Sequence, residues 1–303
     1  MIDIKVSTHR AATLRLSLPG KTAMLHGTIA VLATDPTLDH GAVLTALAMS
    51  DSEDTHLDIH CIGFGSRVPD AFAMKSIAPV RWPDDGAARA EAEALEAALR
   101  PVIPRHRRNI AFHRQAMRKG SAGIQLASTI RFVDWMVAAT PLDPQERPWQ
   151  ISVLEAGLIV GGLPLIVVPK EGAEIAPAPA RIAVAWDGSR EALAAVRSAL
   201  PLLRRAQIID VIVVDPDIRH GDRSDPGGDL ALFLARNGTQ VEINVLSRSR
   251  PRISDVLFRH CFETGAEAMV MGAYGHSRLS KAQWGSTTRD MLHTSKIPLI
   301  LAH

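Results

Sequence analysis

The stretch Val270-Met271-Gly272-Ala273-Tyr274-Gly275-His276-Ser277-Arg278, followed by Gly285-Ser286-Thr287-Thr288, decides the fold of the C-terminal part of this chain. An apolar run stops at a glycine, a second glycine follows, and a helix-like segment opens with Gly-Ser-Thr-Thr. Glycines let backbone N–H groups approach an anion closely, and the free N–H groups of a first helical turn point toward it. The sequence therefore predicts a strand, a phosphate-binding loop and a helix N-terminus, with hydroxyl donors from Ser286 and Thr287.

Other nucleotide-binding motifs do not fit the chain. No lysine precedes Ser286, so the segment is not the phosphate loop of P-loop NTPases. The one Gly-x-Gly after a strand-like run, Gly63-Phe64-Gly65, has Val68 where a dinucleotide fingerprint needs a third glycine or alanine. We interpret that segment as a strand end and a turn.

Length and composition bound the class of protein. The 303 residues suffice for two domains with their own cores. With 34 basic and 32 acidic residues, the net charge of +2 gives no reason to expect a nucleic-acid or membrane partner. No segment reaches the roughly 18 apolar residues of a membrane span, and no signal-peptide pattern opens the sequence. The two distant cysteines, Cys61 and Cys261, favour buried thiols in a reducing compartment, so we expect a cytoplasmic protein.

Strand-like and helix-like segments alternate along the chain. In the second half we expect strands at 181–185, 208–214, 241–246, 268–271 and 297–302, and helices at 190–204, 229–237 and 254–264. The first half repeats this order with strands at 28–33, 57–63, 132–138 and 163–169 and helices at 41–49, 87–99 and 151–159. The basic cluster between Arg105 and Lys119 alternates with apolar residues, which favours a solvated face over a nucleic-acid site. The pattern predicts an α/β fold with parallel sheets covered on both faces.

The spacing Gly-x2-Gly-x9-Gly-Ser, followed by a short helix and a last strand, resembles the ATP-binding signature of the universal stress protein family. Val184-Ala185-Trp186-Asp187-Gly188-Ser189 also resembles the first strand of that family and the aspartate after it. The resemblance implies two tandem open parallel-sheet domains of Rossmann-like (adenine nucleotide alpha hydrolase-like) type, each with five strands. It further implies a degenerate N-terminal domain at 1–170, a linker at 171–180 and an ATP-binding domain at 181–303.

The same resemblance implies which residues bind ATP, with Mg²⁺ as its companion ion. The expected set is Ala185, Asp187, Val213, Met271, Gly272, Gly275, His276, Arg278, Gly285, Ser286 and Thr287. Within it, Asp187 would contact the ribose and the backbone of three strand residues would line the adenine; the alternative for Asp187 is a turn residue that caps the next helix. We expect no catalytic residues and no metal-ligating side chains, because the sequence has neither a general base in an evident position nor a metal-site spacing.

The N-terminal half departs from the family pattern. Asp35 corresponds to Asp187, but the loop Thr140-Pro141-Leu142-Asp143-Pro144 has no Gly-x2-Gly, and its prolines lack the N–H donors that a phosphate needs. We therefore expect this half to be structural. In the resembled family the last strands pair across a two-fold axis, so we predict that 163–169 and 297–302 pair within one chain as a pseudo-dimer; a homodimer beyond that stays open.

These observations predict a universal stress protein that binds ATP in its C-terminal domain and acts as a nucleotide-responsive stress or dormancy factor through an unknown protein partner. Any hydrolysis should be slow. Two alternatives remain: an adenine-nucleotide hydrolase or transferase, and an interaction module that binds no nucleotide.

Overall fold

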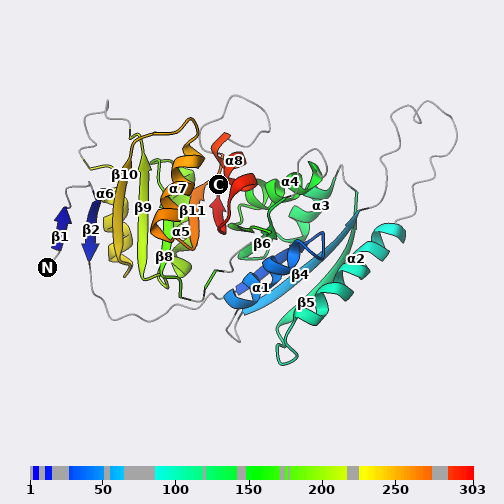
Figure 1. Cartoon of the computed structure of the whole chain (residues 1–303). Helices are drawn as coiled ribbons and strands as arrows, with labels where there is room; N and C mark the ends of the chain where they lie inside the picture. Colours follow the sequence, from blue (N-terminus) through cyan, green and yellow to red (C-terminus); the bar gives the residue numbers. More distant parts are fainter. Residues whose placement is uncertain are drawn as a thin grey trace, which may run out of the picture. The chain divides into compact units, whose positions relative to one another are not determined.

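The computed structural model describes residues 3–6, 11–15, 27–50, 55–64, 86–118, 121–141, 148–170, 175–176, 178–216, 225–274 and 286–303 (Figure 1). The chain divides into two compact units. The C-terminal unit comprises Pro164–His303 together with Met1–Leu25, and the N-terminal unit comprises His26–Leu163. Each unit is described by itself below.

The C-terminal unit is built on one sheet in the order β1-β2-β10-β9-β8-β11-β12-β7. Its five central strands are parallel, because each successive pair of neighbours is in parallel register. They are β10 (Val241–Leu246), β9 (Ile208–Val214), β8 (Arg181–Ala185), β11 (Ala268–Gly272) and β12 (Leu299–Ala302). On one side, β2 (Ala11–Arg15) pairs antiparallel with β10 and carries β1 (Asp3–Val6).

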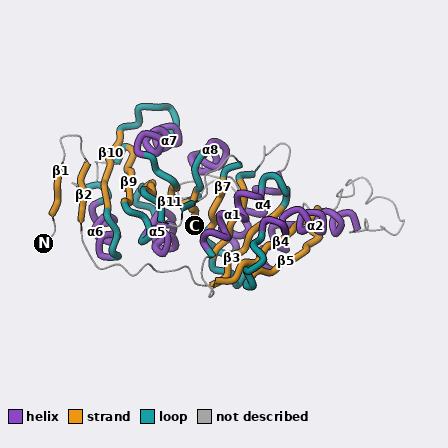
Figure 2. The backbone as a smooth tube through the Cα atoms, turned by 60° about the horizontal axis from the view of Figure 1, so that its bottom comes forward, coloured by secondary structure: helices purple, strands orange, loops and turns teal. Residues whose placement is uncertain are grey.

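Four helices of the described residues cover this sheet, two on each face (Figure 2). They are α5 (Arg190–Leu203), α6 (Gly228–Arg236), α7 (Ile253–Thr264) and α8 (Ser286–Thr294). α5 and α6 lie on one face, and α7 and α8 lie together on the other, where Arg252 at the start of α7 approaches Asp290 of α8 at 3.7 Å. This arrangement follows from the right-handedness of the crossover connections. From β8 to β10 the chain adds strands toward one edge of the sheet, and from β11 to β12 it adds a strand toward the opposite edge, so the connecting helices lie on opposite faces.

The predicted pairing of segments 163–169 and 297–302 is confirmed. Strand β7 (Leu165–Val168) pairs antiparallel with β12, with Ile166 opposite Ile300 and Leu301 opposite Leu165. All residues of both strands are buried, so the pairing covers two apolar edges that would otherwise invite aggregation. As a result, β7 belongs to the C-terminal unit although it follows the elements of the N-terminal unit in the chain.

The four described strands of the N-terminal unit are parallel neighbours in the order β6-β3-β4-β5. Its strands are β3 (Gly27–Ala33), β4 (Thr55–Phe64), β5 (Ile110–Met117) and β6 (Trp135–Ala139). Its helices are α1 (Asp39–Met49), α2 (Gly86–Leu99) with the short helix η2 (Arg100–Val102), α3 (Ala122–Thr129), and α4 (Pro148–Glu155) continued by a π turn, η3 (Ala156–Val160). The predicted α/β class with two tandem open parallel sheets is confirmed.

Some predicted elements differ from those observed. The strand expected at 132–138 begins only at Trp135, because the chain turns there through a bond from Val133 N to Ile130 O and leaves Phe132 86% exposed. Helix α3 was not predicted. The loop 142–147 and the loop 275–285 lie outside the described residues. None of the described helices has the length and apolar character of a membrane span.

Two arginines of the basic cluster have structural partners. Arg107 donates to the carbonyl oxygens of Ser50 (2.6 Å) and Leu47 (3.2 Å) at the C-terminal end of α1, where carbonyl groups run out of N–H donors within the helix. Arg114 donates from Nε to the buried carboxylate of Glu96 on α2 at 2.5 Å, and this bond holds the pKa of Glu96 below its usual value. These contacts favour the interpretation of the cluster as a solvated, structural face.

Candidate functional site at the carboxyl edge of the C-terminal unit

The carboxyl ends of β8, β9 and β11 lie next to one another. The parallel register places Ala185 beside Met271 on one side and beside Ile212 on the other. Ligands of open α/β sheets bind at this edge. The structure therefore brings three of the predicted site residues, Ala185, Val213 and Met271, to one edge. The side chains of Val213 and Met271 are each only 5% exposed, so it is their backbone that a ligand would meet.

A tight turn follows β8. Trp186 N donates to Ile212 O (2.9 Å), and Asp187 Oδ1 then accepts a hydrogen bond from Ser189 N (2.9 Å). Ser189 Oγ accepts from Ala192 N (3.1 Å) and thereby caps α5. The turn role that we kept open for Asp187 is thus present, and the exposed Asp187 also lies at the edge where a ligand would bind.

Gly272 ends β11 and allows a close approach of helix to strand. A Cβ atom at this position would lie 2.5 Å from Ala192 N and 2.7 Å from the carbonyl carbon of Glu191, both in the first turn of α5. Backbone atoms of a capped helix cannot move aside easily. Packing therefore requires a glycine here, whether or not a ligand binds.

Two residues at this edge have left-handed backbone conformations that are uncommon outside glycine. Tyr274, two residues after β11, has φ of +71°, and Asp215, directly after β9, has φ of +44°. In the described part of the chain these are the non-glycine residues with positive φ. Such conformations store strain of the order of 1–3 kcal/mol and cluster at functional sites. Both therefore mark this edge as a candidate site.

Neighbouring groups hold these two strained residues in place. The Tyr274 ring packs edge-on against the His303 ring with the centroids 5.8 Å apart, and His303 Nδ1 lies 3.1 Å from Ala273 O. Asp215 Oδ1 accepts from Arg248 N at 3.1 Å. This contact gives Asp215 a structural role in the turn after β9.

Helix α8 begins at Ser286, where the sequence predicts a helix start. Because β11 and β12 are parallel, the helix that connects them starts at the carboxyl edge, and its free N–H groups face that edge. Thr287 lies in its first turn and is half-buried. Of the other predicted ligands, Gly275, His276, Arg278 and Gly285 lie outside the described residues.

Among the described residues, the shifted pKa values of acidic groups and thiols indicate no nucleophile. Burial raises the pKa of the Glu191 carboxyl, but hydrogen bonds from Arg190 Nε (2.9 Å) and from the backbone outweigh this and hold the pKa below its usual value. Burial raises the pKa of both cysteine thiols, Cys61 and Cys261, to about 12, so neither forms the thiolate of a nucleophile. Among the described residues this edge offers backbone donors and a carboxylate, which suit a bound nucleotide.

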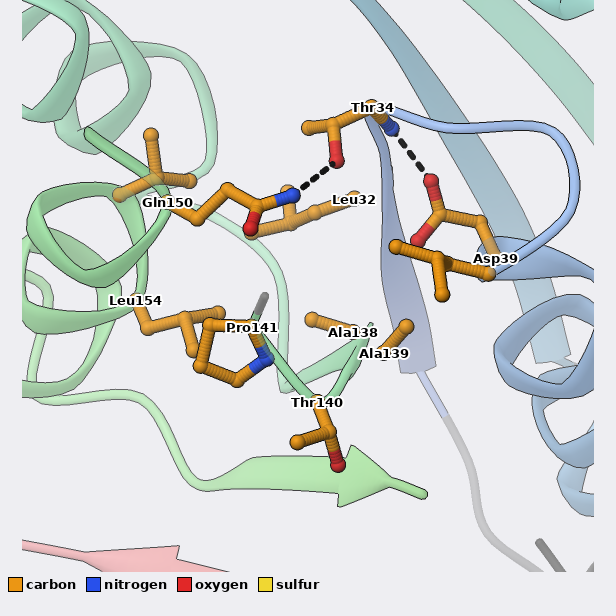
Figure 3. Close-up of a pocket in the computed structure, with 11 residues that line it drawn as sticks. Leu32, Thr34, Asp39, Ala138, Ala139, Thr140, Pro141, Gln150 and Leu154 are labelled. Atoms are coloured by element: carbon orange, nitrogen blue, oxygen red, sulfur yellow. Dashed lines mark hydrogen bonds between the residues drawn. The ribbon is translucent and has the colours of Figure 1, made fainter. Parts of the chain in front are cut away.

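The corresponding edge of the N-terminal unit is closed by its own side chains (Figure 3). The buried Asp39 accepts from the backbone N–H groups of Thr34 (2.5 Å) and Asp35 (2.6 Å), and Gln150 Nε2 donates to Thr34 Oγ1 at 3.2 Å. The cavity that remains beside the buried Pro141 has a volume of about 20 Å³. That volume is close to the space that one water molecule needs. The cavity among these described residues is therefore too small to enclose a nucleotide.

The comparisons with known proteins agree with this fold. The sequence profile described as "Universal stress protein family" matches residues 180–303. A universal stress protein from Archaeoglobus fulgidus DSM 4304 superposes with a TM-score of 0.63 at 11% identity, over 93% of this chain and 98% of its own. A functionally unknown protein from Pseudomonas aeruginosa PAO1 superposes with a TM-score of 0.54 at 15% identity, over 91% of this chain and 92% of its own. No curated protein matches the chain.

At these identities the solved structures establish the fold, and the sequence profile establishes the family of the C-terminal half. The profile begins one residue before β8 and spans every element that forms the candidate site. Residues 180–303 therefore match the universal stress protein family, and the whole chain has the fold of its two-domain structures.

Proposed function

We propose that the C-terminal unit binds one ATP, with Mg²⁺, at the carboxyl edge of its parallel sheet, and that the protein acts as a nucleotide-responsive stress or dormancy factor. The observation that carries the proposal is the sequence Gly272-x2-Gly275-x9-Gly285-Ser286 placed between a strand that ends at this edge and a helix that begins there. Backbone N–H groups at such a position suit a polyphosphate.

The described neighbours of the loop support an adenine nucleotide. The ends of β8, β9 and β11 offer backbone groups to the adenine base. Asp187, two residues after β8, has an exposed carboxylate that suits the ribose hydroxyls. His276 and Arg278 are the proposed phosphate partners from the loop. Since the described part of this edge holds no side chain placed as a general base, hydrolysis should be slow.

The N-terminal unit binds no ATP in this proposal. Asp39 already takes up the backbone N–H groups that follow β3, and Pro141 stands where a glycine loop would begin. Strand β7, which follows the N-terminal unit in the chain and belongs to the C-terminal unit, pairs with β12, and this pairing resembles an intramolecular dimer contact. We propose this pseudo-dimer as the functional form, in a cytoplasmic protein that signals to a protein partner.

Replacing Gly275 with alanine should remove ATP-dependent stabilisation. A ligand that binds only the folded state stabilises it by RT ln(1 + [L]/Kd), which is roughly 2.7 kcal/mol when free ATP is 100 times Kd. We expect Mg²⁺-ATP to raise the melting temperature of the natural chain and to leave that of Gly275→Ala nearly unchanged. The measurement is thermal denaturation with and without Mg²⁺-ATP.

The matched control is Gly238→Ala, in the same unit. Gly238 follows α6 at the opposite edge of the sheet, and a Cβ atom there meets nothing within 4 Å. This variant should keep the full ATP-dependent shift. The proposal would be contradicted if Mg²⁺-ATP did not raise the melting temperature of the natural chain, or if it raised that of Gly275→Ala as much as that of the control. Either result would favour a module that binds no nucleotide.

A further inference from the structure

Three side chains with metal-ligating atoms meet on the sheet of the N-terminal unit. Asp58 and His60 come from β4, and His113 comes from β5, directly opposite His60 in the parallel register. One ligating atom of each lies within 4.8 Å of those of the other two. His113 Nε2 is 3.2 Å from Asp58 Oδ1, and the two imidazole rings stack with their centroids 4.8 Å apart. We call Asp58, His60 and His113 the β4–β5 cluster.

The β4–β5 cluster lies on the sheet face away from α2. Alternate residues of a strand point to opposite faces. Helix α2 packs on the face of Gly63 and Arg114, since a Cβ at Gly63 would meet the Ala88 carbonyl oxygen and Arg114 pairs with Glu96 of α2. The cluster therefore faces the other side, where Asp58 and His113 reach solvent with side chains 29% and 43% exposed. A metal ion has an open path to it.

His60 provides the observation that points to a ligand. It is only 3% exposed, and within the described residues its Nε2 atom has no hydrogen-bond partner. Its Nδ1 atom lies 3.0 Å from Nε2 of the Gln115 side-chain amide, whose Oε1 atom also has no partner. An unsatisfied buried polar atom costs about 1–3 kcal/mol, so two beside one another call for an explanation.

A rotation of the Gln115 side-chain amide by 180° exchanges its oxygen and nitrogen atoms. This rotation explains why both Gln115 Oε1 and His60 Nε2 lack partners. The amide oxygen then accepts from Nδ1–H of His60, and Nε2 of His60 keeps its lone pair for a metal. Metal-binding histidines ordinarily donate their second N–H to such an oxygen, which fixes the tautomer and the ring orientation. Gln115 would thus be the positioning residue of the cluster.

One donor pair of the cluster already has the spacing of a small tetrahedral site. Zinc binds imidazole nitrogen and carboxylate oxygen at about 2.0–2.2 Å, which puts neighbouring donor atoms of a tetrahedron about 3.3 Å apart. Asp58 and His113 already have this separation. The rings of His60 and His113 are only 19° from parallel, so His113, the exposed member, would turn its ring toward the ion. A water molecule would complete the coordination.

We propose that the β4–β5 cluster is a divalent transition-metal site for Zn²⁺, with Asp58, His60 and His113 as ligands and Gln115 orienting His60. The ion would tie the edge strand β5 to β4. Sequence spacing gave no hint of this site, because Asp58 and His60 share one strand and His113 comes from another, 53 positions later. The site is independent of the proposed ATP site.

The test is a calorimetric titration of Zn²⁺ into the full chain after removal of metal by a chelator, without nucleotide and with a weak competing chelator to mask surface histidines. The natural chain should bind one Zn²⁺, and His113→Gln should bind it at least 10-fold more weakly. The control is His56→Gln, an exposed histidine on the same face of β4, which should bind as the natural chain does.

A second variant tests whether Asp58 binds a metal ion or only pairs with His113. Asp58→Asn keeps a neutral oxygen but lowers the affinity for a cation, so Zn²⁺ affinity should fall at least 10-fold while circular dichroism stays unchanged. Gln115→Leu should weaken binding by about 10- to 100-fold, as for other lost partners of metal-bound histidines. Absent binding to the natural chain, or equal binding by His113→Gln and His56→Gln, would overturn the proposal.

Discussion

Gly272→Ala is expected to destabilise the C-terminal unit by about 3 kcal/mol, the upper end of what overpacking costs. The added Cβ would stand 2.5 Å from Ala192 N and 2.7 Å from the Glu191 carbonyl carbon, and both are backbone atoms. Ser189 caps this helical turn, so the strand end and the helix must move apart as wholes. Urea denaturation of the full chain measures the change.

Gly238→Ala is again the appropriate control, because it adds the same methyl group into open space. Its φ of +85° makes the substitution cost about 1–2 kcal/mol through backbone strain alone. Gly272 has no positive φ, so this strain is absent from Gly272→Ala and the difference between the two variants is a lower limit for the steric overlap at Gly272. Equal losses would contradict the close strand–helix packing described for β11 and α5.

Asp210→Ala is expected to lower the free energy of unfolding by about 3–5 kcal/mol, the cost of removing one partner from a buried charged network. Asp210 lies on β9 with no exposed surface. Its carboxylate accepts from Asn244 Nδ2 (2.7 Å) and is 2.8 Å from His260 Nε2, with Arg181 Nη1 at 3.7 Å. Without the Asp210 carboxylate, the side chains of Asn244 and His260 lose a buried hydrogen-bond partner.

Two further variants show whether the effect comes from burial. Asp210→Asn keeps the shape and one acceptor, so it should lose clearly less than Asp210→Ala. Glu263→Ala breaks an exposed ion pair with Arg259 (2.7 Å) on α7, and such pairs contribute only about 0–1 kcal/mol. A loss for Asp210→Ala no larger than that for Glu263→Ala would show that the network contributes little.

The elements of the C-terminal unit could be predicted closely from the sequence. Strands 181–185, 208–214 and 241–246 have the predicted bounds, because each is rich in valine, isoleucine or alanine and a turn-forming residue follows within two positions. The start of α5 follows from Ser189 as its cap, and the end of α7 follows from Gly265, whose φ of +68° no other residue adopts as readily.

The N-terminal unit was harder because hydrophobicity alone does not report burial. Phe132 is apolar and exposed, which misplaced the start of β6. Helix α3, eight residues long, shows no strong helical pattern in its sequence.

The pairing of β7 with β12 could be predicted, but the side-chain contacts between distant residues could not. The closure of the β3 edge by Asp39 depends on how the chain folds back after β3. The overlap that makes Gly272 necessary depends on how near α5 comes to β11, and the β4–β5 cluster depends on strand register. The motif predicted where a site should form, but it did not reveal that packing already accounts for one of its glycines.

The most direct measurement is a calorimetric titration of ATP with Mg²⁺ into the full chain and into Gly275→Val. The proposal predicts one binding site per chain, lost in the variant while the fold is retained. Two sites per chain would contradict the closed edge of the N-terminal unit, and no site would contradict nucleotide binding altogether.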